Sequence, residues 1–457
     1  MKEKEQFILD IKRLGINGEG IGFYNKLAVF VDGAIPGEGH EVCVTKCESK
    51  MAFAESVGIK TVSKARKEAE CPYYSSCGGC AVMHIQYVTM LKYKRDLLIE
   101  ALNRYTRLET RSFEIRSTVP SEHILGYRNK SQLPVKKLGK TTKVCMIKAK
   151  SNELVPIDSC LVTNPLINEL NTKILEIADE LGISSYVPKF TRGVLRYLVI
   201  RVNKKNEALV CFVCFEKNKK IYELAQRVMM LEGVKGVYEN FNDSKKTSAI
   251  FGNVTNHLAG NPYIVETLGN IEYQIYPTTF FQLNSYQAEV MYDIVLKCCK
   301  LSRQERVLDA YCGVGAIGLY LAKMAKEVIG IEYNKDSVLA ANENAKLNKI
   351  KNAKFYQGDA SLLLPKMIKN GTDFDVIVCD PPRVGLGKAF IEAILSTEVK
   401  RLVYVSCNPA TLAKDLELLS EKYMVNSITP VDMFPQTPLV ECVAQLTHIE
   451  STPAKNK

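Results

Sequence analysis

The sequence lacks any long apolar run. No stretch of about 18 consecutive apolar residues occurs, so no membrane-spanning helix is predicted. The opening residues, MKEKEQFILDIK, are charged where a secretion signal would carry an apolar segment, which favours a cytoplasmic protein. Internal repeats and low-complexity tracts are missing as well. The 457 residues, 46% of them hydrophobic, therefore indicate a globular protein of two to four domains.

Charge and cysteine content narrow the possible partners and metals. Lys and Arg number 61 against 50 Asp and Glu, which gives a formal net charge of +11. Such a balance fits a polyanionic partner such as nucleic acid, and it fits an ordinary solvated surface about equally well. The fifteen cysteines are unsuited to a disulfide framework in a reducing cytoplasm. Those that cluster therefore point to a metal site or to catalysis.

The pattern of apolar runs predicts three domains. Residues 1–60 alternate short strand-like runs with Gly-rich turns, which indicates a small β-barrel. Residues 61–275 predict a mixed α+β domain, although its basic helix at about 88–108 could instead pack on the C-terminal domain. In residues 276–457, strand-length and helix-length segments alternate from about 302 onward. This rhythm is typical of a doubly wound parallel sheet with ligands at the carboxyl ends of its strands.

A glycine-rich turn follows the first of these strands. The run RVLDAY leads into CGVGAIG at 312–318, and the next strand ends at Glu332. NAD and S-adenosylmethionine fit this pattern equally well, since each could offer its ribose hydroxyls to Glu332. A glycine turn that serves only the fold is the third alternative.

The fourth and the last strands carry further polar residues. The run FDVIVCD leads directly into Asp380-Pro-Pro-Arg383, which resembles the loop by which many methyltransferases hold a planar base and the cofactor. The final segment resembles the closing hairpin of their sheets, whose last strand is antiparallel. Glu441 begins that strand, so we expect it to face Cys407 and Asp380.

Cys407 stands in the stretch VYVSCNPATLAKD, at the end of a strand. Asn408-Pro409 should open the next helix, whose N-terminal amides favour a thiolate. Buried, inert packing is the alternative for any single cysteine. A thiolate paired with a carboxylate suits one chemistry especially well. The thiolate adds to C6 of a uracil so that C5 accepts a methyl group, and a base, for which Glu441 is the candidate, then removes the C5 proton.

A second group of cysteines predicts a metal site. Cys71, Cys77 and Cys80 lie within ten residues of one another in CPYYSSCGGC, and Cys160 is a plausible fourth member. Four thiolates fit a zinc ion or an iron–sulfur cluster, and spacing alone slightly favours zinc because zinc sites are more common.

Taken together, these motifs resemble the RNA uracil-C5 methyltransferase family, in particular its 23S rRNA 5-methyluridine branch with an N-terminal TRAM domain. The resemblance covers nearly the whole chain. It rests on TRAM-like features in residues 1–60, the cysteines at 71, 77, 80 and 160, TTFFQLN at 278–284, DAYCGVG at 309–315, DPPR at 380–383, SCNPATL at 406–412 and MFPQTPLVE at 433–441.

The resemblance implies a fold and a set of site residues. The fold would be an OB-like TRAM barrel, a central α+β domain with an iron–sulfur cluster, and a Rossmann-like class I S-adenosylmethionine-dependent methyltransferase domain. Cys407 would be the nucleophile and Glu441 the proton acceptor. S-adenosylmethionine would be bound by Gln282, Tyr311, Glu332 and Asp380. A 4Fe–4S cluster would be held by Cys71, Cys77, Cys80 and Cys160, in place of the zinc that spacing favours.

Two positions depart from the family pattern, and two neighbouring aromatic residues allow two interpretations. Ala316 stands where some members have Asn, so no side-chain contact to the methionine part is implied there. Leu439 stands where members often have His, so a hydrogen bond from that His is not implied either. Phe280 and Phe281 could stack on a base, and core packing is an equal alternative.

The resulting hypothesis is an enzyme that methylates C5 of a uridine in 23S rRNA, with RNA as its partner and no membrane or obligate protein partner. The same chemistry on the tRNA T-loop is the nearest alternative. Two alternatives come from other classes: an NAD-dependent dehydrogenase, and a non-catalytic metal-bearing RNA-binding protein. The dehydrogenase would leave Cys407, the Asp380 loop and the clustered cysteines without roles.

Overall fold

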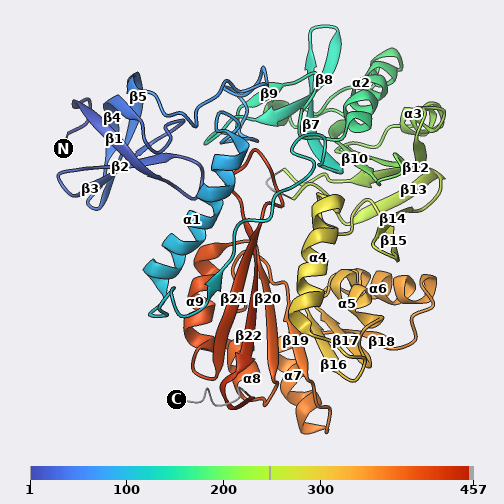
Figure 1. Cartoon of the computed structure of the whole chain (residues 1–457). Coiled ribbons are helices and arrows are strands. Elements are labelled where there is room, and N and C mark those ends of the chain that lie inside the picture. Colours follow the sequence, from blue (N-terminus) through green and yellow to red (C-terminus); the bar gives the residue numbers. More distant parts are fainter. Residues whose placement is uncertain (1, 246–248, 452–457) are drawn as a thin grey trace. The chain divides into compact units, whose positions relative to one another are not determined.

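The computed structural model describes residues 2–245 and 249–451 (Figure 1). The chain divides into two compact units, which we describe separately. Unit 1 comprises the residues up to Ser121, Pro382–Gly387 and Val405–Leu446. Unit 2 comprises Glu122–Pro381, Lys388–Tyr404 and the residues from Thr447 on.

The first part of unit 1 is a closed five-stranded barrel, as the sequence predicts. Its strands follow the order β1-β2-β3-β5-β4. Their bounds are β1 Gln6–Leu14, β2 Gly20–Tyr24, β3 Leu27–Val31, β4 Gly39–Cys47 and β5 Met51–Thr61. Alternate side chains such as Leu9, Ile11 and Val42 fill the interior. At Gly22 a Cβ atom would lie 2.5 Å from the carbonyl oxygen of Asp10, so the barrel closes tightly only with glycine there.

The rest of unit 1 contains a long helix, α1, together with one further helix and three strands. The elements are α1 Tyr87–Tyr105, β6 Glu114–Ile115, α9 Pro409–Leu419, β21 Tyr423–Val431 and β22 Glu441–His448, whose last two residues fall in unit 2. The strands are neighbours in the order β22-β21-β6, and β6 runs parallel to β21. Helix α1 packs against α9 (Figure 1). Its buried face consists of Met90, Lys94, Leu98, Ala101 and Leu102.

Unit 2 begins with a seven-stranded sheet of order β13-β12-β11-β10-β7-β8-β9. The elements are β7 Lys130–Leu138, β8 Thr141–Ile147, β9 Leu154–Pro156, α2 Pro165–Glu180, η1 Pro188–Phe190, β10 Leu195–Val202, β11 Ala208–Cys214, α3 Lys220–Met229, β12 Val234–Phe241 and β13 Val254–Gly260. The hairpin that the sequence predicts on either side of residues 203–206 is confirmed, because β10 and β11 pair antiparallel. A separate two-stranded sheet pairs β14 Ile264–Leu268 with β15 Ile271–Ile275.

Unit 2 also contains parallel strands in the order β18-β17-β16-β19-β20. Their bounds are β16 Arg306–Ala310, β17 Glu327–Glu332, β18 Ala353–Gln357, β19 Val376–Cys379 and β20 Arg401–Ser406, whose last two residues fall in unit 1. The helices here are α4 Ser285–Cys299, α5 Ala316–Ala322, α6 Lys335–Leu347, α7 Ala360–Lys369 and α8 Lys388–Leu395, followed by η2 Ile449–Ser451. The βαβ rhythm that the sequence predicts after residue 302 is present.

Two sequence predictions concern the chain as a whole. The three-domain division at residues 60 and 275 stays a prediction. Among the helices that the structure describes, none is both long and apolar enough to cross a membrane.

Candidate active site

The glycine turn of unit 2 is built from residues with left-handed backbone. Tyr311, Gly313 and Gly315 have φ angles of 63°, 54° and 78°. A Cβ atom at Gly315 would lie 2.8 Å from the ring of Phe355, so this position excludes larger residues. Glu332 braces the turn, because its carboxylate accepts hydrogen bonds from the Gly313 amide at 3.1 Å and from a neighbouring amide at 2.7 Å. The turn and the end of β17 therefore form one polar edge.

Three carboxylates gather at the carboxyl ends of these strands. Burial raises the pKa of Asp309 to about 8, and the charges of Asp380 and Glu332 add to the shift. Burial also raises the pKa of Asp380 to about 7. A positively charged ligand would relieve this crowding. Sequence analysis missed Asp309, although an acid inside the apolar strand RVLDAY is a usable signal.

The aromatic and amide candidates of unit 2 are held in different ways. The ring of Tyr311 packs edge-on against Phe390, with centroids 5.4 Å apart. Gln282 is 9% exposed, and its main-chain carbonyl oxygen accepts a hydrogen bond from the side-chain amide of Asn129 at 2.9 Å. Phe281 is buried at 2% exposure, whereas Phe280 is 67% exposed. Core packing thus explains Phe281, and Phe280 is available to stack.

Two buried cations, one of which contacts Thr279 just before Phe280, were not found by sequence analysis. Lys130 and Arg201 are directly opposite on β7 and β10. Burial lowers the pKa of Lys130 to about 7 and that of Arg201 to about 10. One guanidinium nitrogen of Arg201 donates to the Thr279 carbonyl at 2.9 Å, while Nε and Nη1 have no hydrogen-bond partner among the described residues. Two desolvated cations in this arrangement favour an anionic ligand.

In unit 1, Cys407 directly precedes a helix. The side chain of Asn408 caps α9 by accepting a hydrogen bond from the Ala410 amide at 3.0 Å, and Pro409 occupies the first turn. Cys407 itself is half-buried. The predicted helix start is confirmed, and Cys407 stands directly before the N-cap of α9.

Glu441 is the first residue of β22 and is 7% exposed. Burial raises the pKa of the adjacent Cys442 thiol, and the charges of Glu441 and Cys407 raise it further. Both groups therefore lie close to Cys442. The fold thus brings Cys407 near the start of β22, although the two are distant in sequence. That Glu441 faces Cys407, and the catalytic roles of both residues, remain predictions.

The four clustered cysteines are divided between the two units. Cys71, Cys77 and Cys80 lie in one loop of unit 1, and Cys160 lies in unit 2. All four are partly exposed, and none of them forms a disulfide with another described cysteine. The Gly79 amide donates to the Cys77 sulfur at 3.3 Å, a contact that suits a thiolate. The metal assignment stays a prediction.

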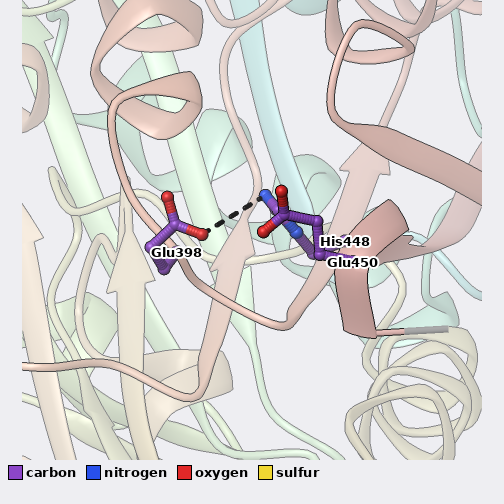
Figure 2. Close-up of side chains that lie close together, drawn as sticks. All are labelled: Glu398, His448 and Glu450. Atoms are coloured by element: carbon purple, nitrogen blue, oxygen red, sulfur yellow. Dashed lines mark ion pairs between the residues drawn. The ribbon is translucent and has the colours of Figure 1, made fainter.

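Another group of potential metal ligands lies elsewhere in unit 2. In the described ranges, ligand atoms of Glu398, His448 and Glu450 lie within 4.8 Å of one another (Figure 2). His448 is buried, and its Nε2 atom lies 3.9 Å from the Glu398 carboxylate. The two acids are exposed, and exposed acidic groups commonly lie near a histidine without any metal.

Comparisons with known proteins identify the family. The model for the tRNA (Uracil-5-)-methyltransferase family matches residues 258–449, and the TRAM domain model matches residues 5–57. An uncharacterized RNA methyltransferase of Listeria monocytogenes is 39% identical over 98% of both chains. The chain belongs to the uracil-5 RNA methyltransferase family with a TRAM domain. This membership leaves the NAD-dependent dehydrogenase alternative without support.

Further relatives agree in length and fold. An uncharacterized RNA methyltransferase of Halalkalibacterium halodurans is 40% identical over 98% of this chain and 97% of its own. The crystal structure of Pyrococcus abyssi tRNA (uracil-54, C5)-methyltransferase in complex with S-adenosyl-L-homocysteine has a TM-score of 0.77 and 31% identity. It covers 96% of this chain and 99% of that one. The match to the uracil-5 methyltransferase model contains Gln282, Cys407 and Glu441, whereas the four clustered cysteines lie outside both matched segments.

Proposed function

We propose that the protein transfers a methyl group from S-adenosylmethionine to C5 of a uridine in 23S rRNA. The observation that carries this proposal is the placement of Cys407 directly before the N-cap of α9 and near the start of β22, where Glu441 stands. A nucleophile and a base at one place are what C5 methylation of a uracil requires. Family membership supports the same reaction.

The proposed reaction begins at Cys407. Its thiolate attacks C6, the S–C6 bond forms, and the electron pair of the C5–C6 double bond becomes available at C5. S-adenosylmethionine would supply an electrophilic methyl group. The C5 electron pair bonds to that methyl group as the methyl–sulfur bond breaks, and the cofactor leaves as S-adenosylhomocysteine. Glu441 then removes the remaining C5 proton. The C5–H electron pair restores the double bond, the S–C6 bond breaks, and Cys407 leaves as a thiolate.

The polar edge of unit 2 is the proposed place of S-adenosylmethionine. Its ribose hydroxyls would pair with Glu332. Its positive sulfonium suits the buried acid Asp309 and the half-buried acid Asp380. Tyr311 and Gln282 complete the proposed set. The left-handed glycine turn leaves room for close approach of the ligand.

RNA is the proposed partner on grounds of charge. The net charge of +11 and the TRAM barrel favour contact with phosphates. Lys130 and Arg201 offer buried cations for one phosphate group, and the exposed ring of Phe280 offers a surface on which an extruded base can stack.

The tRNA T-loop is the second candidate substrate. A specific observation favours it, since the Pyrococcus abyssi protein that this chain resembles is named a tRNA (uracil-54, C5)-methyltransferase. The 23S rRNA substrate is favoured by the resemblance of the TRAM domain and clustered cysteines to the rRNA branch.

Cys71, Cys77, Cys80 and Cys160 are proposed to hold a 4Fe–4S cluster. Four thiols outside any disulfide are the donor set that such a cluster takes, and the Gly79 amide can donate to a cluster-bound sulfur. The cluster has a structural role in this proposal, because the reaction needs no electron transfer. A brown anaerobic preparation is expected, while colourless protein with stoichiometric zinc would contradict the assignment.

The direct test uses purified protein, S-adenosylmethionine carrying a labelled methyl group, and separate transcripts of 23S rRNA and tRNA. We expect label in 5-methyluridine of the 23S rRNA. Label only in tRNA would favour the second candidate, and label in neither RNA would contradict both.

A further inference from the structure

The ammonium group of Lys94 is completely buried in unit 1. The residue lies in the middle of α1 and is 0% exposed. Its Nζ atom donates to the carboxylate of Asp432, to the carbonyl oxygen of Leu439 at 2.6 Å and to that of Phe434 at 3.2 Å. An ammonium group has three N–H donors, so every one of them is used.

These three acceptors lie at both ends of one loop, which we call the 432–440 loop. Asp432 directly follows β21, and Leu439 stands two residues before Glu441, the first residue of β22. Lys94 therefore ties the two ends of the loop to each other and to α1. The Val82 amide donates to the Gln436 carbonyl at 3.3 Å, which fixes the middle of the loop as well.

Burying the ammonium group of Lys94 among the apolar residues of α1 costs desolvation free energy. One turn before and one turn after Lys94, the same face of α1 carries the buried apolar residues Met90 and Leu98. Burial lowers the pKa of Lys94, although the charges of Asp432 and Glu441 and the hydrogen bond to Asp432 oppose that shift. Because apolar replacements of a buried ion pair are often neutral or stabilising, stability alone does not explain the charge. Its three directed hydrogen bonds do one thing that an apolar side chain cannot, which is to fix the path of the loop.

We propose that Lys94 is a positioning residue that holds Glu441 in place for removal of the C5 proton. It acts through the 432–440 loop and touches neither RNA nor cofactor. The proposal rests on the proposed function, because Glu441 has this task only if the enzyme methylates C5 of a uridine. Leu439 contributes its main-chain oxygen, so the residue type at this position is free to differ from the His of other members.

The test separates two steps of one turnover. RNA carrying tritium at C5 of uridine releases it to water when the C5 proton is removed, and methyl-labelled S-adenosylmethionine reports the earlier transfer. The variant Lys94→Met keeps the length of the side chain and loses its charge and donors. The double variant Lys94→Met/Asp432→Asn avoids an unpaired buried carboxylate and guards against simple unfolding. Lys92→Met, at an exposed position of the same helix, is the matched control.

With both Lys94 variants we expect a fast first phase in which about one methyl group per enzyme is transferred, followed by tritium release that is slower by about tenfold to 100-fold. A covalent protein–RNA species that survives denaturing electrophoresis should accumulate. In the parent and in Lys92→Met the two signals should rise together. If the signals stay matched in both Lys94 variants, at whatever rate, the proposal is wrong. Absence of methyl transfer by the parent would instead contradict the proposed function.

Discussion

The two units hold their site residues by different means. Unit 2 places Tyr311 and Glu332 by local geometry, through a left-handed turn and the end of β17. Unit 1 places Glu441 through a side chain of α1, since Lys94 and its partner Asp432 are 338 positions apart in the chain. The proposed cofactor edge thus depends on motifs that are short in sequence, and the proposed catalytic pair depends on packing between distant segments. Damage to each unit should therefore impair a different step.

The largest effect is expected in unit 1, from Cys407→Ala. Loss of the nucleophile should lower methylation by at least about 10³-fold, because no adduct at C6 can form. Binding of S-adenosylhomocysteine to unit 2, measured by calorimetry, should stay unchanged. Buried Cys379→Ala is the matched control. A Cys407→Ala protein that methylates as fast as the parent would rule out the covalent route.

The next effect separates two adjacent aromatic residues of unit 2. Phe280→Ala should lower RNA affinity by about tenfold, because the exposed ring is lost as a stacking surface. Phe281→Ala should instead lower the free energy of unfolding by about 3–5 kcal/mol, because that ring is buried. Binding titrations and denaturant melts measure the two quantities. Equal effects of both changes on RNA binding would remove the distinction.

An effect on affinity of about the same size is expected at the glycine turn. Gly315→Ala should raise the Kd for S-adenosylhomocysteine by about tenfold, because the added Cβ would lie 2.8 Å from Phe355 and strain a left-handed residue. Gly371→Ala is the control, since its φ is also positive, at 80°, while no other atom lies within 4 Å. An unchanged Kd in Gly315→Ala would show that the turn does not shape the cofactor site.

The smallest effect is a pH dependence of stability. Asp309 has a folded pKa of about 8 against an ordinary value of 3.8. Between those values the native state binds more protons than the unfolded state, so this group makes stability fall as pH rises from about 4 to 8. Asp309→Asn, which keeps an acceptor for the Gly318 amide, should flatten that decline.

Thermal melts of the parent and of Asp309→Asn across this pH range provide the measurement. The Tm of the parent should fall by a few degrees relative to the variant. Parallel curves for the two proteins would mean that Asp309 titrates as an exposed acid does.

Local patterns in the sequence predicted most of the fold. The barrel, the β10–β11 hairpin and the parallel strands after residue 302 follow from short-range periodicity and turn residues. Asn408-Pro409 likewise predicted the start of α9. These features depend on neighbours in sequence, so one sequence suffices to find them.

The residues that sequence analysis missed are charged side chains that only the tertiary fold buries. Lys94 looks like one more charge on a basic helix, and its burial follows only from packing of α1 against distant segments. The buried acid Asp309 and the facing cations Lys130 and Arg201 also acquire their character from the tertiary fold. Charge alone cannot tell a desolvated side chain from a solvated one.

The central claim is that this chain makes 5-methyluridine in RNA. Mass mapping of ribosomal and transfer RNA, from cells with and without the gene, tests it most directly. We predict that at least one 5-methyluridine of 23S rRNA disappears without the gene and returns with the parent protein, though not with Cys407→Ala. Unchanged 5-methyluridine in every ribosomal and transfer RNA would contradict the account.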